Sequence, residues 1–302
     1  MSLVSSAHGT SDESLKIFPF SAVQGQERCK KALILAAINP KIGGVLLCSP
    51  AACGKSTLSR GLIDILPGTA QRNSDFVTAS LTASEEMLLG TLDLDHVLNQ
   101  QNVHFSPGLL SKAHGGVLYA EQVNQLPELL VAQLLNAAGS GVNRVERYGL
   151  SHAHLANFTL IATINPEQGP LSQQLLDRFG FVVHLDSSYS LAQRVEIIKT
   201  RRAFESDPGR FCEFYQMRQV ELQQQISDAR DLLHSVTFPD NILSDIAQRC
   251  DAAQVNGLCA DLQFSQAAGA HAAWQGAQEV TAADIDAVEP FVLSHRKSGL
   301  CK

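Results

Sequence analysis

The chain has 302 residues, of which 45% are hydrophobic and 18% charged, and its formal net charge at pH 7 is −7. These values are typical of a globular protein long enough for two domains, and the acidic balance argues against a general nucleic-acid-binding protein. No apolar run approaches the ~20 residues of a membrane-spanning helix, and the first residues lack a secretory signal pattern. Seven scattered cysteines without a CxxC pair indicate neither a zinc site nor a disulfide framework, so we expect a reducing compartment.

The N-terminal part begins with residues 1–16, which are small and polar and are expected to form a disordered arm. Residues 28–38 then show helical spacing of apolar side chains, and Asn39-Pro40 ends that helix because proline disfavours helix at the preceding residue. An apolar run over 44–47 predicts a buried strand, and a second helix is expected over 57–66.

The loop between that strand and helix resembles a phosphate-binding P-loop, because a Gly-Lys-Ser sequence joins a buried strand to a helix. Lys55 would reach the β- and γ-phosphates, and the Ser56 hydroxyl would hold Mg²⁺. The first position of the pattern normally carries glycine, whereas this chain has Ser49, so an ordinary strand–helix turn with a surface lysine stays open. The predicted nucleotide-binding residues are Ser49, Pro50, Ala51, Ala52, Cys53, Gly54, Lys55, Ser56 and Thr57.

Further strands and helices alternate up to residue 190, which predicts a parallel α/β sheet covered on both faces. No element can be placed with confidence over 69–108. Strands are expected over 116–120, 158–163 and 181–185, helices over 109–113, 127–138 and 173–179, and a hairpin over 139–150.

After residue 190 the strand patterns stop, and five helices are expected over 191–204, 207–234, 239–250, 258–275 and 282–294. Asp207-Pro208 and Thr281 with Asp284 supply the capping patterns of two of them. The sequence therefore predicts three parts: a disordered arm over 1–16, a nucleotide-binding α/β domain over 17–190, and an all-helical domain over 191–302.

Several motifs together resemble the magnesium chelatase I subunit, a family of AAA+ ATPases. The resemblance covers about residues 17–296, and it implies an AAA+ domain followed by a helical lid. The motifs are Phe18–Val23 with Gly25–Glu27, Asn39–Val45, Gly141–Asn143 with Val145–Arg147, Asn165–Gly169, Gln174–Gly180, and Gly257-Leu258 with Ala260–Leu262.

The resemblance implies a ring-forming ATPase that uses ATP and Mg²⁺ to drive metal insertion into a tetrapyrrole on a separate large subunit. It also implies a homo- or hetero-hexameric ring, a chelatase D-type partner, and a location in the cytoplasm or, in a eukaryote, the plastid stroma. By position, Asn165 would be the sensor that orients the attacking water, and Arg178 the arginine finger that reaches a neighbour's γ-phosphate. An alternative for Arg178 is a salt bridge with Asp177.

The chain departs from the family pattern at positions that act on nucleotide. The Mg²⁺-associated aspartate is replaced by Glu121, and the general-base glutamate by Gln122, whose amide can hold a water molecule but cannot accept its proton. An arginine that the lid would contribute to the γ-phosphate is replaced by Cys259, so closure of the lid over ATP should weaken. Ser49 is the fourth departure.

These departures favour a chain that binds nucleotide, hydrolyses it weakly, and completes a neighbour's site through Arg178. Three further hypotheses stay open. The first is a non-catalytic, D-like regulatory assembly module, either an I-like paralogue or a fragment of a longer D-like protein. The second is a remodelling ATPase of the related MoxR type. The third is an active I-type ATPase with tolerated substitutions.

Overall fold

A computed structural model describes residues 16–50, 53–68, 75–93, 104–147, 150–186 and 188–296. The arm expected over the first 16 residues lies outside them except for Lys16, and so do Ala51 and Ala52 of the P-loop. Within the described residues, no helix combines the length and the apolar character that crossing a bilayer requires.

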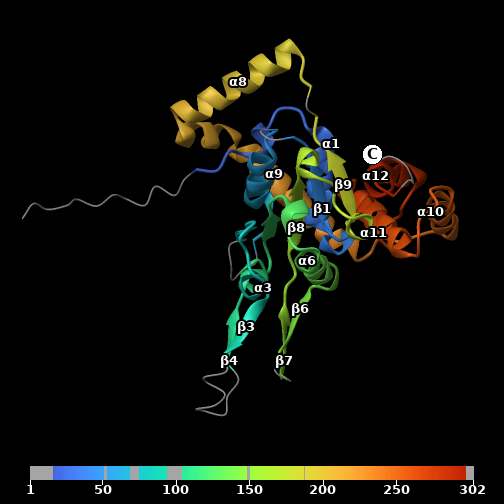
Figure 1. The fold of residues 1–302 in the computed structure, drawn as a ribbon. Helices are drawn as coiled ribbons and strands as arrows, with labels where there is room; N and C mark the ends of the chain where they lie inside the picture. The colour runs from blue at the N-terminus through green and yellow to red at the C-terminus, as the bar shows by residue number, and fades with distance from the viewer. Residues whose placement is uncertain are drawn as a thin grey trace, which may run out of the picture.

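A five-stranded parallel sheet lies at the centre of the molecule, in the order β2-β5-β8-β1-β9 (Figure 1). It confirms the predicted parallel α/β sheet and adds an edge strand, β2, from the region where no element could be placed. The strands are β1 (Val45–Cys48), β2 (Phe76–Ala79), β5 (Val117–Ala120), β8 (Thr159–Ile164) and β9 (Phe181–His184).

Side chains alternate between the two faces of this sheet, as strand geometry requires, and each face has its own hydrophobic core. On one face, Leu47 and Tyr119 pack with α1 (Glu27–Ile38) and with helices of the C-terminal region. On the other face, Leu46 and Leu118 pack with α6 (Glu128–Ser140) and the short helices α3 (Glu85–Leu89) and α5 (Leu109–Lys112).

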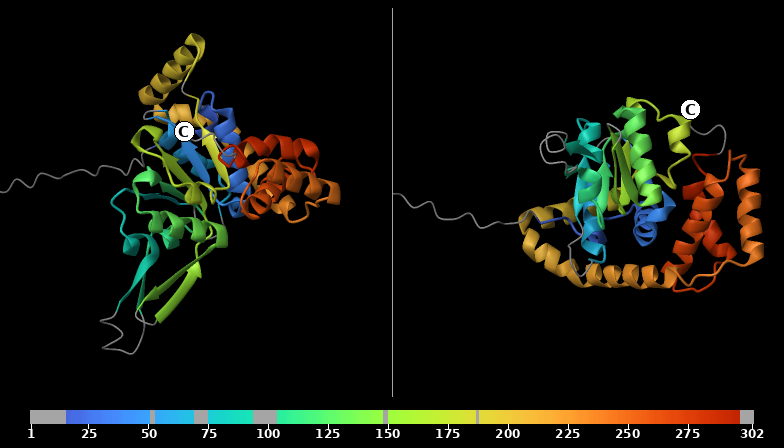
Figure 2. Two further views of the ribbon diagram at one scale, coloured as in Figure 1. Left: turned by 45° about the vertical axis from the view of Figure 1, so that its right-hand side comes forward. Right: turned by 90° about the horizontal axis from the view of Figure 1, so that it is seen from below.

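Two antiparallel hairpins project from one side of the sheet domain, next to each other (Figures 1 and 2). They are β3 (Gly90–Asp93) with β4 (His104–Pro107), and β6 (Val142–Arg147) with β7 (Leu150–Leu155). The hairpin expected over 139–150 is therefore shifted, because α6 continues to Ser140 and ends at Gly141, whose φ of 70° is left-handed.

The short elements that connect the strands are mostly 3-10 turns and one-turn helices. The P-loop helix α2 (Lys55–Gly61) begins two residues earlier than expected and continues as η3 (Leu62–Ile65). The others are η1 (Phe20–Ala22), η2 (Pro40–Ile42), η4 (Val123–Gln125), η5 (Pro166–Gln168) and α7 (Gln173–Leu176).

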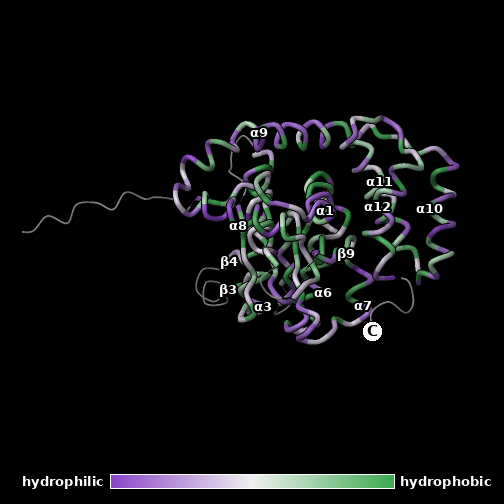
Figure 3. The backbone as a smooth tube through the Cα atoms, turned by 90° about the horizontal axis from the view of Figure 1, so that it is seen from above, coloured by the Kyte–Doolittle hydropathy of each residue, from purple (hydrophilic) through white to green (hydrophobic). Residues whose placement is uncertain are grey.

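The C-terminal region is helical, as predicted, and the long helix α9 (Pro208–Leu233) runs along the molecule from α8 (Leu191–Ser206) to a compact cluster of three helices (Figures 2 and 3). That cluster comprises α10 (Asp240–Ala252), α11 (Cys259–Trp274) and α12 (Ala282–Val292). Asp207 caps α9, and Thr281 with Asp284 forms a capping box at α12, as their sequence patterns indicate.

Candidate functional site

The P-loop lies where β1 ends and α2 begins, at the carboxyl edge of the sheet. The half-buried Lys55 ammonium group donates hydrogen bonds to the backbone oxygens of Ser49 and Pro50, at 2.7 and 2.8 Å, and to Ser49 Oγ at 2.9 Å. Burial lowers the pKa of Lys55, and the neighbouring Cys53 and Cys48 thiols partly oppose that shift. The lysine is thus held over its own loop.

Serine is compatible with position 49 because the backbone there does not need glycine. Among the described non-glycine residues, positive φ occurs only at Gln26, Gln122 and Gln254. Among the described loop residues, Gly54 is left-handed with φ of 81°, and no described heavy atom beyond its two chain neighbours lies within 4 Å of a Cβ built on it. In this structure Ser49 contributes a hydroxyl oxygen that binds the Lys55 ammonium group.

The ends of β5 and β8 lie at the same edge of the sheet, because Ala120 pairs with Ala162 and Cys48 pairs with Ile164. In the sheet, β8 lies between β5 and the P-loop strand β1. Glu121 directly follows β5, so it lies at this carboxyl edge, and it is half-buried.

Gln122 follows in the left-handed region with φ of 48°, and its N–H donates to Thr163 Oγ1 at 3.0 Å. This backbone contact fixes the turn in which the glutamine side chain stands.

Tyr119 links the strand to the P-loop. Its ring is buried, and its hydroxyl group donates to Ser56 Oγ at 3.4 Å. Burial is the main reason that the pKa of Tyr119 is raised; the Glu121 carboxylate adds to the shift, and the Ser56 and Thr163 hydroxyls oppose it. Sequence analysis missed Tyr119, although the two-residue period of a strand places it on the same face as Glu121.

Asn165 directly follows β8 and is buried, so its position at the carboxyl edge agrees with a sensor. Its amide bonds within its own turn: Oδ1 accepts from the N–H of Glu167 at 3.2 Å, and Nδ2 donates to Glu167 Oε2 at 3.4 Å. Asn124 Nδ2 also donates to the carbonyl oxygens of Asn165 and Gly169. The Asn165 amide is thus engaged within the turn that follows β8.

A cavity of about 250 Å³ lies beside the P-loop, between the N-terminal segment and α8. Its walls include Phe18, Tyr189 and, from the P-loop and its helix, Cys53, Gly54 and Thr57. Gln26, buried and left-handed at φ of 60°, shapes one wall because its Nε2 donates to Tyr189 Oη and to the Asp186 carbonyl oxygen. An aromatic and amide-lined hollow beside the P-loop has the chemistry that a purine base requires.

The donor set suits Mg²⁺ only when phosphate oxygens complete it. Ser56 offers a hydroxyl group and Glu121 a carboxylate at this edge, and both are oxygen ligands of the kind that Mg²⁺ takes. Across the described ranges, no group of three or more His, Cys, Asp or Glu side chains is placed to hold a metal ion. Ser56 and Glu121 would therefore hold Mg²⁺ together with nucleotide, where the ion neutralises phosphate charge.

Arg178 lies at the opposite end of the sheet from Lys55. It precedes β9, whose first residue, Phe181, pairs with Val45 at the start of β1, whereas the P-loop follows the end of β1. Its guanidinium group donates to the carbonyl oxygen of Ala132 at 3.3 Å and to Asn136 Oδ1, both on α6, rather than to the Asp177 carboxylate. Its guanidinium group therefore lies at the opposite edge of the sheet from Lys55 and is bonded to α6.

Cys259 lies at the same end of the sheet as Arg178. This position corrects the expectation that the helix of Cys259 closes over the chain's own P-loop. Cys259 is exposed and begins α11, and one turn later Gln263 Nε2 donates to the Arg178 carbonyl oxygen at 2.9 Å. Helix α11 also packs on η2, just before β1. The physical reason is α9, which carries the last three helices to the far end of the sheet (Figures 2 and 3).

Comparisons with known proteins agree with this fold and motif set. The family model "Magnesium chelatase, subunit ChlI" matches residues 19–175, and the model "AAA lid domain" matches residues 243–300. The ChlI-2 subunit of Arabidopsis thaliana is 38% identical over 93% of this chain and 75% of its own length. An uncharacterized protein of Mycobacterium tuberculosis is 44% identical over 94% of this chain, but the chain spans only 45% of that protein.

Among solved structures, a chain in the magnesium chelatase complex of subunits BchI and BchD is 36% identical, with a TM-score of 0.57 over 93% of this chain and 96% of that one. A putative ATPase from Cytophaga hutchinsonii shares the fold, with 19% identity and a TM-score of 0.67 over 92% of this chain and 84% of that one. The length of the match to ChlI, and the identity over most of both chains, show that this chain belongs to the magnesium chelatase ChlI family of AAA+ ATPases.

Proposed function

We propose that this chain is an ATP-binding AAA+ ring subunit of a magnesium-chelatase-type complex that drives metal insertion into a tetrapyrrole. In this proposal, Lys55, Ser56 and Glu121 hold ATP with Mg²⁺, and the chain's own hydrolysis is weak. Arg178 completes the nucleotide site of a neighbouring protomer. Its partners are other AAA+ protomers in a homo- or hetero-hexamer, a D-type subunit and a large tetrapyrrole-binding subunit.

The observation that carries the proposal is the separation of the two sets of residues. Lys55, Ser56 and Glu121 lie at the carboxyl edge of the sheet, and Arg178 lies at its amino edge. One protomer offers both halves of a nucleotide site but cannot join them, whereas two protomers side by side can. The BchI–BchD relative supports the assembly, since that structure is described as the complex between subunits BchI and BchD of magnesium chelatase.

Weak hydrolysis is supported by Gln122, because the position where the family carries a base holds an amide. A regulatory, non-hydrolysing module is therefore the second candidate function. It shares the nucleotide site and the trans-acting Arg178 with the first and differs only in having no turnover of its own.

Nucleotide binding is tested with a fluorescent ATP analogue, beside ATP hydrolysis by the same preparation. We expect binding by the wild type, with turnover far below that of an active I-type subunit, and loss of binding in Lys55→Ala. Lys41→Ala, an exposed lysine before β1, serves as the control and should bind normally. Absence of nucleotide binding by the wild type would contradict the proposal. Rapid ATP turnover by the wild type would show that the Gln122 amide does not make hydrolysis weak.

The role of Arg178 is tested by mixing this chain with a purified, ATP-hydrolysing I-type subunit. We expect the wild type to change the ATPase rate of the mixture and Arg178→Ala to abolish the change, because an arginine finger neutralises transition-state charge. Equal effects of the two proteins would refute the trans role. Adding D-type and large subunits with a porphyrin then tests metal insertion; a mixture that never metallates would favour a remodelling ATPase.

A further inference from the structure

The backbone on both sides of Arg178 is held by the helical region. Arg296, just after α12, donates through Nη2 to the carbonyl oxygen of Asp177 at 2.7 Å and to that of Phe179 at 2.8 Å. Gln263 of α11 donates to the carbonyl oxygen between them, that of Arg178, at 2.9 Å. Three consecutive carbonyl groups therefore bind two side chains that lie 85 or more residues further along the chain.

The two side chains also bind each other, since Arg296 Nη2 donates to Gln263 Oε1. Gln263 thus uses its amide oxygen on Arg296 and its amide nitrogen on the Arg178 carbonyl oxygen. The pair behaves as one unit, and removal of either member leaves the other with an unmet bond in a buried place.

Arg296 is buried, and the hydrogen bonds of its guanidinium group go to neutral oxygens: Val292, Asp177 and Phe179 carbonyls and the Gln263 amide. Burial lowers the pKa of Arg296 to about 10, so it stays protonated at neutral pH. Carbonyl groups at helix C-termini carry partial negative charge, and Val292 ends α12 while Asp177 follows α7. The cation is therefore stabilised by carbonyl groups of the loop and of α12, together with the Gln263 amide oxygen.

Two glycines allow this approach. A Cβ on Gly43 would lie 2.8 Å from Gln263 Nε2, and a Cβ on Gly180 would lie 2.0 Å from the Ile42 carbonyl oxygen. The turn before β1 and the turn before β9 thus lie directly against one another, with the Gln263 amide between them. The loop is enclosed by backbone on one side and by Arg296 on the other.

We propose that Arg296 and Gln263 are positioning residues for Arg178, so that the helical region sets the conformation of the loop that carries the trans-acting arginine. The consequence for a neighbour's ATPase rests on the proposed function, whereas the ordering of the loop does not. A shift of the last three helices would move Arg178, because its backbone is bonded to them and its side chain is bonded only to α6 among the described contacts. Catalytic geometry is sensitive to displacements of about 1 Å.

The first test measures hydrogen exchange in the peptide that covers residues 175–181, in the full-length chain. We expect faster exchange in Arg296→Gln and in Gln263→Leu. The matched control is Arg230→Gln, because Arg230 also binds a carbonyl oxygen, that of Ala37, through Nε and Nη2, but at the end of α1. The positioning role would be overturned if exchange in this peptide were equally faster in the Arg230→Gln control. It would also be overturned if exchange were no faster in the other two variants than in the wild type.

The second test is a double-mutant cycle in the mixed ATPase assay with an active I-type subunit. Arg296→Gln should lower the stimulated kcat roughly 10- to 100-fold, with little change in the KM for ATP, because the nucleotide lies at the other end of the sheet. In an Arg178→Ala background the same change should have no further effect. A loss that persists in that background means a purely structural role and overturns the proposal.

The two tests separate this inference from the proposed function. If Arg178→Ala leaves the assay unchanged while exchange quickens in Arg296→Gln, the trans role of Arg178 is wrong and the ordering of the loop stands. If Arg178→Ala abolishes the effect while Arg296→Gln alters neither exchange nor rate, the proposed function stands and the positioning role is wrong.

Discussion

At the end of β5, Gln122 lies in a turn whose backbone is fixed by the hydrogen bond from the Gln122 N–H to Thr163 Oγ1. Gln122 takes the left-handed conformation there, with φ of 48°. Under the proposed function its amide stands where a general base is needed, and an amide cannot accept a proton.

Restoring that group should restore hydrolysis. We expect Gln122→Glu to raise ATP turnover by about 10²- to 10⁴-fold, the usual contribution of a general base, with unchanged nucleotide affinity. Turnover is measured by phosphate release, and affinity by the fluorescent analogue. Gln125→Glu adds the same charge on an exposed position of the following turn and should leave turnover as it was. An equal gain in both variants would mean a general charge effect.

The location of Cys259 in the fold changes the effect that we expect from a substitution there. Since it lies at the Arg178 end, an arginine there would lie at the opposite edge of the sheet from Lys55 and, under the proposed function, would act on a neighbouring protomer. A Cys259→Arg change is thus expected to act, together with Arg178, in mixed assemblies and to leave nucleotide binding by the isolated chain unchanged.

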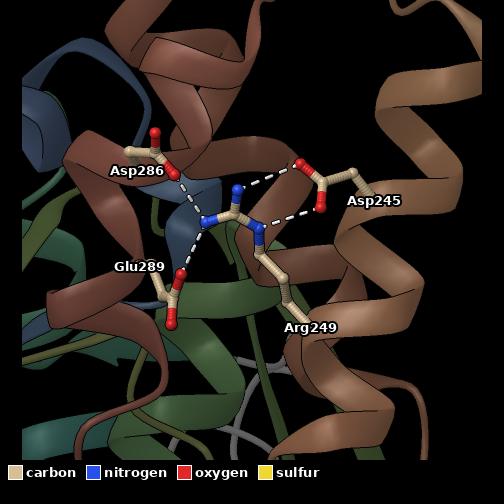
Figure 4. Close-up of polar contacts among 4 residues, drawn as sticks. All are labelled: Asp245, Arg249, Asp286 and Glu289. Atoms are coloured by element: carbon tan, nitrogen blue, oxygen red, sulfur yellow. Dashed lines mark hydrogen bonds and ion pairs between the residues drawn. The ribbon is translucent and has the colours of Figure 1, made fainter.

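At the scale of elements, α10 and α12 are joined by one arginine and three carboxylates (Figure 4). Arg249 forms a bidentate pair with Asp245, one turn earlier on α10, with N···O distances of 3.0 and 3.1 Å. Its Nη1 also lies 2.7 Å from Asp286 and 2.6 Å from Glu289 on α12. Hydrogen bonds to the Asp245 carboxylate are the main reason that the pKa of Arg249 is raised. The arginine offsets repulsion among three negative charges on two helices.

Removal of this arginine should therefore cost more than removal of a surface pair. We expect Arg249→Met to lower the free energy of unfolding by about 1–3 kcal/mol, because it takes away charge-assisted hydrogen bonds and leaves like charges together. Arg144→Met, in an exposed pair with Glu146 at 3.9 Å, is the matched control and should cost less than about 1 kcal/mol. Urea unfolding gives both values, and equal losses would argue against the network.

At the scale of the whole molecule, the α/β layer and the helical region share one hydrophobic core. The core on the α1 face of the sheet contains Val45 and Phe181 from strands together with Phe264 and Phe291 from α11 and α12. The division into two domains at residue 190 stays a prediction, and this shared core means that the two parts should unfold cooperatively.

His295 lies where the two regions meet and should make stability depend on pH. Burial, and the nearby Arg296 and His184, lower its pKa to about 3. Because the unfolded histidine titrates near pH ~6.5, the unfolded chain binds the proton first as the pH falls. The free energy of unfolding should then drop by about 1 kcal/mol from pH 6.5 to 5.5 through this group.

The measurement is urea unfolding at several pH values, followed by the fluorescence of Trp274, the single tryptophan. His295→Leu should flatten the decline below pH ~6.5, since no proton can then be taken up at this site. The pair His271–Asp284, at 2.6 Å, remains in the variant, and burial lowers the pKa of His271 too, so a residual decline is expected. His234→Leu, at an exposed position, should keep the full slope; an unchanged slope in His295→Leu would contradict the assignment.

The amino-acid sequence by itself determined the buried strands, most helices and the residues of the P-loop, because these depend on neighbours along the chain. Apolar runs, two-residue and helical periods, and capping residues are local signals. They failed for β2, whose four residues at the sheet edge are only half-buried for the most part and show no clear alternation. The position of Glu121 and Gln122 at a strand end was also readable, since it follows directly from the end of an apolar run.

Only the tertiary structure decided which ends of the elements meet. The bond from Tyr119 to Ser56 spans 63 residues, and the bonds from Arg296 to the Arg178 loop span 117 and 119. No local pattern specifies such contacts, because they depend on sheet order, on register and on the path of α9. The sequence therefore predicted the members of a nucleotide site, whereas the fold alone assigned Lys55 to one edge of the sheet and Arg178, with Cys259, to the other.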